Sequence, residues 1–178
     1  MTPENVPYRM ETGLPYREAE HPGHAGCRLD VYYPDRSAGF ATVVWLYGGG
    51  LVSGQRYVPG ELKEQGLAVV APDYRLHPQV RAPAYIEDAA AAVAWTFRNI
   101  GRYGGDPARI FLAGASAGGY LTALIGLDRR WLAAHGVEAN RLAGLIVLTG
   151  QLVTHFTVRA ERGIPEGRVV VDELAPLY

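Results

Sequence analysis

The stretch Gly114-Ala115-Ser116-Ala117-Gly118-Gly119 separates an apolar run, Arg109–Ala113, from a segment that we expect to be helical as far as about Leu127. A serine on a tight strand-to-helix turn is held in strained backbone geometry, and glycines two residues before and after it leave room for that turn. The start of the following helix favours negative charge that develops beside the hydroxyl. The stretch therefore predicts a nucleophilic Ser116, against the alternative of a glycine-rich turn that only packs.

Outward from this turn, short apolar runs alternate with longer helical or loop segments, which is typical of βαβ units and a mainly parallel sheet. Four runs are nearly continuously apolar, as expected of strands covered on both faces, and a fifth alternates weakly before Pro34 and suits an outer strand. The predicted strands are Ala41–Tyr47, Leu67–Ala71, Arg109–Ala113, Leu142–Thr149 and the outer Cys27–Tyr33. The predicted helices are Pro59–Gln65, Ala84–Ile100, Ser116 to about Leu127, and a short addition at Trp131–Ala134.

Composition narrows the class of protein. The 178 residues suit one domain, and 17 basic against 18 acidic side chains give no charge excess that would point to a nucleic acid or membrane surface. Cys27 is the single cysteine, no Cys/His cluster has zinc spacing, and no nucleotide-binding glycine motif is present, so we expect no disulfide, metal or cofactor. The first twenty residues carry no signal-peptide core, and the longest apolar run, Leu142–Leu148, is far short of the ~20 residues of a membrane span, so a soluble cytoplasmic protein is expected.

A second glycine cluster, Tyr47-Gly48-Gly49-Gly50, follows the predicted strand Ala41–Tyr47. Successive glycines present bare backbone N–H groups that can approach a ligand oxygen, as an oxyanion hole requires. A flexible loop is the alternative for such a cluster taken alone. Together with a later nucleophile turn it predicts acyl transfer to water, with a second N–H donated by the residue after the serine, Ala117.

In these motifs the chain resembles the α/β-hydrolase carboxylesterases related to hormone-sensitive lipase and to the esterase and feruloyl-esterase-like group. The resemblance runs from about Arg28 to Tyr178 and rests on five stretches: residues 46–50 (LYGGG), 72–78 (PDYRLHP), 87–90 (EDAA), 104–110 (GGDPARI) and 114–119 (GASAGG). It implies an α/β-hydrolase fold, a small-molecule ester as substrate, Ser116 as nucleophile, and an oxyanion hole of Gly48 or Gly49 with Ala117. The 72–78 and 104–110 stretches are interpreted as loop anchors that support the fold.

The sequence departs from the family pattern in two places. Tyr47 stands where family members usually carry His, which makes Tyr47 and the adjacent Gly50 candidate pocket residues. The family order also places an acid and then a His after the serine, at the ends of later strands. Nothing here fits that order. Asp128 is expected at a helix end, Asp172 and Glu173 lie in the tail, His135 is expected in a surface loop, and His155 is a candidate pocket residue rather than a base.

The expected organisation is an N-terminal arm, 1–26, and an incomplete, C-terminally truncated α/β-hydrolase domain, 27–178. Without its acid and base the serine is expected to be impaired in this chain alone. Arylformamidase-type amide hydrolysis and a non-catalytic pseudoenzyme or binding protein are the alternatives to ester hydrolysis. The strand Leu142–Thr149 is expected to be an exposed sheet edge, which favours self-association.

Overall fold

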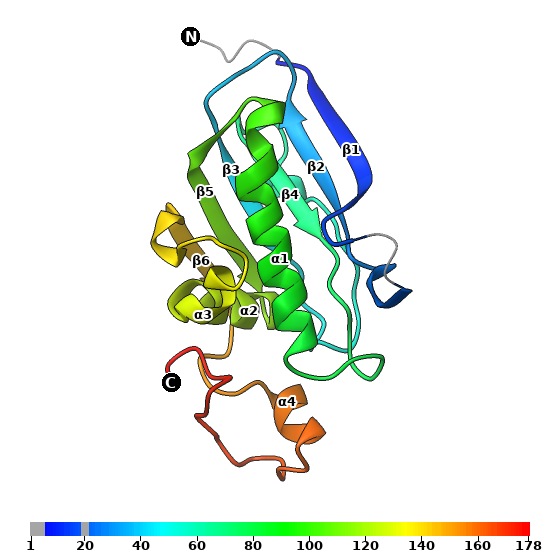
Figure 1. The fold of residues 1–178 in the computed structure, drawn as a ribbon, viewed down its shortest axis with the longest axis vertical. Coiled ribbons are helices and arrows are strands. Elements are labelled where there is room, and N and C mark those ends of the chain that lie inside the picture. Colours follow the sequence, from blue (N-terminus) through cyan, green and yellow to red (C-terminus); the bar gives the residue numbers. More distant parts are fainter. Residues whose placement is uncertain (1–5, 19–21) are drawn as a thin grey trace.

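One six-stranded sheet organises the chain in the computed structural model, which describes residues 6–18 and 22–178 (Figure 1). The strand order is β1-β2-β4-β3-β5-β6, and β3 pairs in parallel with both β4 and β5, as β5 does with β6. The strands are β1 (Tyr8–Pro15), β2 (Arg28–Pro34), β3 (Phe40–Leu46), β4 (Ala68–Pro72), β5 (Gly105–Ala115) and β6 (Gly144–Leu148). The prediction of an α/β fold with a mainly parallel sheet is confirmed.

The N-terminal side of the sheet differs from the prediction. β2 is an inner strand, antiparallel to both β1 and β4, so its assignment as an outer strand is wrong. The pattern missed β1, which lies in the predicted N-terminal arm, because most of its residues are exposed and carry no apolar alternation. Asp30 of β2 accepts the N–H of Gly13, 2.8 Å away, which holds an irregularity in β1 against its neighbour.

The helices are placed by their apolar faces. The two longest are α1 (Ala84–Asn99) and α2 (Ala117–Leu127), both close to their predicted limits, and shorter ones are α3 (Arg129–Ala133) and α4 (Phe156–Glu161). Short 3-10 turns occur at η1 (Pro22–His24), η2 (Gly60–Leu62), η3 (Ile100–Tyr103) and η4 (Ala139–Arg141). The predicted helix Pro59–Gln65 is wrong beyond its first turn, because Lys63 is extended and Glu64 has a φ of 59°.

Alternate residues of each strand face opposite sides of the sheet, as a pleated strand requires. Val44 and Leu46 of β3 belong to the main core beneath α1 and α2, whereas Val43 and Trp45 belong to a smaller cluster on the other face. The segment that carries Val58 and Leu62 packs against part of that second face. The main core therefore lies on the side where the helices pack.

The last strand, β6, pairs with β5 alone and forms one edge of the sheet. Its final residues Ile146, Val147 and Leu148 are 44%, 36% and 45% exposed. An apolar edge strand of this kind is a template for pairing with another chain. None of the described helices is both long and apolar enough to cross a lipid bilayer.

Candidate active site

The turn at Ser116 has the geometry that its sequence predicts. Ser116 has a φ of 54° and lies between the last residue of β5 and the first of α2, and its side chain is exposed. A non-glycine residue at positive φ costs of order 1–3 kcal/mol, so the surrounding structure must hold it in place. The Ser116 N–H donates to Leu148 O at 2.8 Å, and the Ser116 carbonyl accepts Tyr120 N–H at 2.9 Å.

The flanking glycines are required by close backbone contacts. A Cβ on Gly114 would lie 2.4 Å from Gly118 O, and a Cβ on Gly118 would lie 2.0 Å from Leu46 O. Real Cβ atoms essentially never approach another atom this closely. The start of α2 therefore lies directly against the end of β3, where the second glycine cluster begins.

This second cluster contacts the serine. The glycine loop, residues 47–54, follows β3, and a Cβ on Gly48 would lie 3.0 Å from Ala115 O and 3.3 Å from Ser116 Cβ. Carbonyls of the glycine loop are fixed: Val52 and Ser53 N–H donate to Gly49 O, both at 3.1 Å, and His77 N–H donates to Leu51 O at 2.8 Å. Within the described residues, the N–H groups of Gly48, Gly49 and Ala117 make no hydrogen bond with the protein. Backbone donors thus remain available beside the serine.

Tyr47, the first residue of the glycine loop, is 2% exposed. Its ring stacks on Tyr74 with centroids 4.4 Å apart, its hydroxyl donates to Tyr74 O at 3.3 Å, and the Tyr74 hydroxyl donates to Tyr47 O at 2.7 Å. Burial raises the pKa of the Tyr47 hydroxyl. Tyr47 also lines a cavity of about 340 Å³ with Asp73 and Arg75 among its other walls. The tyrosine thus anchors the start of the glycine loop.

His155 is 1% exposed and lies at the N-terminus of α4, where its Nδ1 accepts the N–H of Thr157 at 3.2 Å. Its ring packs against Tyr120 and Phe156, with centroids 5.1 and 4.2 Å away. Burial, with a smaller effect of the Arg159 charge, lowers the pKa of His155 to about 4. The imidazole is therefore a neutral helix cap at neutral pH, with one nitrogen already engaged.

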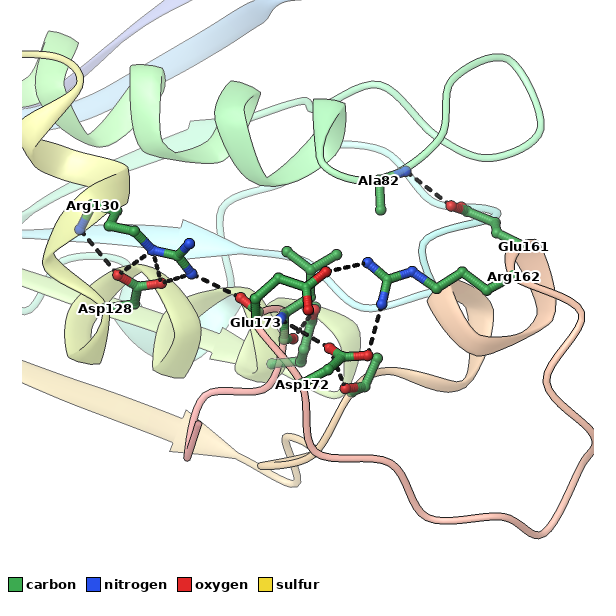
Figure 2. Close-up of polar contacts among 10 residues, drawn as sticks. Ala82, Asp128, Arg130, Glu161, Arg162, Asp172 and Glu173 are labelled. Atoms are coloured by element: carbon green, nitrogen blue, oxygen red, sulfur yellow. Dashed lines mark hydrogen bonds and ion pairs between the residues drawn. The ribbon is translucent and has the colours of Figure 1, made fainter.

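The acids after the serine bind structural partners. Asp128 caps α3 and pairs with Arg130 at 2.6 Å, at the helix end predicted for it. Figure 2 shows Arg162 between the carboxylates of Asp172 and Glu173, at 2.7 and 2.8 Å. Within the described residues, none of these carboxylates pairs with a histidine, and Ser116 Oγ makes no hydrogen bond.

The stretches interpreted as loop anchors make polar contacts, and the contact of Arg75 with Asp88 has a buried carboxylate. Asp88 of α1 is fully buried and accepts two hydrogen bonds from Arg75, at 2.6 and 2.9 Å. Asp73 accepts Arg56 N–H at 2.7 Å and pairs with the Arg56 guanidinium, and Ala108 N–H donates to Asp106 at 2.8 Å. No group of three or more His, Cys, Asp or Glu in the described part of the chain is placed to hold a metal ion.

The sheet, the strained serine between β5 and α2, and the glycine loop against it define an α/β-hydrolase. Residues 29–141 match the BD-FAE family, and the chain belongs to that family. The predicted resemblance to the α/β-hydrolase carboxylesterases is confirmed.

Curated relatives match over part of their length. A probable isoprenylcysteine alpha-carbonyl methylesterase of Oryza sativa subsp. japonica is 39% identical over 101 residues, which cover 54% of this chain and 24% of that protein. Esterase LipC of Mycobacterium tuberculosis is 40% identical over 90 residues, which cover 48% of this chain and 22% of that protein. The matched region thus spans about a quarter of these relatives.

Solved esterases share the fold over most of the chain. A bacterial heroin esterase superposes with a TM-score of 0.64 at 27% identity, and the match covers 85% of this chain and 46% of that one. A Pyrobaculum calidifontis esterase gives a TM-score of 0.64 at 29% identity and covers 96% of this chain and 55% of that one.

Proposed function

We propose that this chain carries the nucleophile half of a serine carboxylic-ester hydrolase that acts on small-molecule esters. The observation that carries the proposal is the contact between the two glycine motifs, with the Gly48 backbone against Ser116 Cβ. This contact supports the proposal, because an oxyanion hole needs backbone N–H donors near the serine, where a tetrahedral intermediate would develop its negative charge. The esterase names of the relatives and of the solved structures support the same reaction class.

In the proposed reaction, Ser116 Oγ attacks the ester carbonyl carbon while its proton passes to a base. The oxyanion that forms accepts hydrogen bonds from the N–H of Ala117 and of Gly48 or Gly49. Collapse of the intermediate expels the alcohol, which takes up the proton, and leaves an acyl-Ser116. Water then adds to the acyl carbonyl and releases the acid, which restores the serine.

Among the described residues, no histidine hydrogen-bonds to Ser116 Oγ, and the histidine that lies beside a carboxylate, His77, is 3.2 Å from Glu161. His155 is buried as a neutral cap, and the acids of the tail pair with arginines. We therefore propose that this chain alone hydrolyses esters slowly, because no described residue is placed to take the proton of Ser116. Loss of a triad member in serine proteases leaves roughly 10³ to 10⁴-fold catalysis over water.

The test is the hydrolysis of matched substrates, p-nitrophenyl acetate and an aryl formamide, by the wild-type chain and by Ser116→Ala. We expect slow ester hydrolysis that is abolished in Ser116→Ala. Faster turnover of the formamide than of the ester would favour an arylformamidase instead. No Ser116-dependent turnover of either substrate by a folded chain would favour a non-catalytic binding protein.

A further inference from the structure

Two exposed apolar side chains flank the third glycine of the glycine loop. Phe156 and Val52 are 47% and 49% exposed. A Cβ on Gly50 would lie 3.1 Å from Phe156 Cζ and 3.7 Å from Val52 Cγ2. Phe156 comes from α4, more than a hundred residues further along the chain, so tertiary structure brings this ring to the glycine loop. Exposed large apolar groups gathered at one place are typical of a binding surface.

This pair, named here the apolar wall (Val52 and Phe156), borders the glycine loop at Gly50, two residues after the glycine that lies against Ser116. The glycine that lies against Ser116 is Gly48. Since Gly50 is two residues further along the chain, the α-carbons of Gly48 and Gly50 are at most about 7 Å apart. Ser116 and Phe156 thus lie against the same short loop, and the part of an ester that follows this loop from a carbonyl at Ser116 would meet the Phe156 ring. α4 lies beyond the end of the sheet, next to the segments that follow the strands (Figure 1).

Hydrogen bonds at both ends of α4 hold Phe156 in place. At its start, Thr157 Oγ1 donates to Gly50 O and Thr157 N–H donates to His155 Nδ1. At its end, the buried Glu161 carboxylate accepts Ala82 N–H at 2.9 Å, which Figure 2 shows, and the Tyr85 hydroxyl at 3.2 Å. His77 Nδ1 lies 3.2 Å from the same carboxylate. A side chain supported in this way is preorganised for recognition, because little order must be gained on binding.

We propose that the apolar wall is the specificity determinant of this site and selects esters that carry an aliphatic chain of several carbons over acetyl-sized ones. The inference rests on the proposed function, since it assigns a substrate class to that same site. Each methylene that the wall removes from water favours the longer ester by roughly four-fold. Phe156 offers the larger surface of the two residues, so most of the discrimination depends on its ring.

The first measurement is binding, which needs no turnover: the dissociation constant of N-methyloctanamide, an uncharged ester isostere, followed by NMR titration. We expect binding about ten-fold weaker in Phe156→Ala than in the wild type, and nearly wild-type binding in Phe156→Leu, which keeps an apolar side chain. Leu127→Ala is the matched control, because Leu127 is 53% exposed and ends α2, roughly 15 Å along the helix from Ser116. It should bind as the wild type does.

The second measurement is the ratio of kcat/KM for p-nitrophenyl octanoate to that for the acetate. We expect Phe156→Ala to lower the ratio about ten-fold, mainly through a smaller kcat/KM for the octanoate. Hydrolysis of both esters with an unchanged ratio and unchanged amide binding would overturn the inference and leave the proposed function standing. Absence of amide binding by the wild type would also overturn it. Phe156-dependent amide binding without any hydrolysis would support the inference and contradict the proposed function.

Discussion

Gly118→Ala should damage the chain far more than its single added methyl group suggests. The new Cβ would lie 2.0 Å from Leu46 O and 2.6 Å from Tyr47 O, whereas ordinary contacts are 3.4–4 Å. The start of α2 and the end of β3 must therefore separate by about 1.4 Å (3.4 − 2.0). Both atoms are backbone, so no side-chain rotation relieves the overlap. Overpacking of this kind typically costs about 1–3 kcal/mol.

Urea denaturation measures this cost. With a slope of about 2 kcal/mol per molar urea, a loss of 2 kcal/mol lowers the midpoint by about 1 M. Gly101→Ala is the matched control, because no atom lies within 4 Å of its Cβ position, and its midpoint should change little. Equal midpoints for the two variants would refute the close contact between α2 and β3. The same separation moves Ser116 from the glycine loop, and a misplacement of about 1 Å can cost roughly a hundred-fold in rate.

Three further predictions concern stability and association. Burial lowers the pKa of His155 from 6.5 to about 4, so the unfolded chain binds a proton at this residue more readily than the folded chain does. The free energy of unfolding should therefore be highest above about pH 6.5 and should fall by about 3 kcal/mol as the pH drops toward 4. His155→Asn keeps a side-chain acceptor for the helix cap but does not titrate, so its urea midpoint should vary less between pH 6.5 and 4 than that of the wild type. An equally steep fall in the variant would show that His155 is not the cause. Asp88→Asn breaks a buried ion pair with Arg75 and should lower the free energy of unfolding by about 3 kcal/mol in the same assay. A decrease below about 1 kcal/mol would show that this ion pair contributes little to stability. Light scattering should show that the chain self-associates through β6, and Val147→Lys should weaken this association. A 19.3 kDa monomer at every protein concentration would rule out the association.

The local sequence was sufficient to predict the central strands and the longest helix of this fold. Continuous apolar runs located β3 to β6, and the helical spacing of Ile86, Ala89, Ala90 and Val93 located α1. Both signals come from burial within a single element. β1 carries no such signal, because it is held by backbone pairing with β2 while most of its side chains face solvent.

The site was predictable only where its residues form motifs. The two glycine clusters identified Ser116 and the glycine loop, since the contacts that require glycine are backbone contacts. Phe156 and the capping role of His155 were not predictable, because α4 has only six residues and its position depends on bonds to distant residues such as Gly50. His155 follows the predicted strand Leu142–Thr149, which favoured a pocket-lining role, and in the structure its ring is buried and packs against Tyr120.

The central claim is that Ser116 is the nucleophile, and covalent labelling tests it most directly. The chain has three serines, Ser37, Ser53 and Ser116, and only Ser116 occupies the strained turn against the glycine loop. A fluorophosphonate probe followed by peptide mass spectrometry should therefore modify Ser116, and Ser116→Ala should remain unlabelled. Modification of Ser53 or Ser37 instead, or no labelling of wild-type chain that unfolds cooperatively, would contradict the claim.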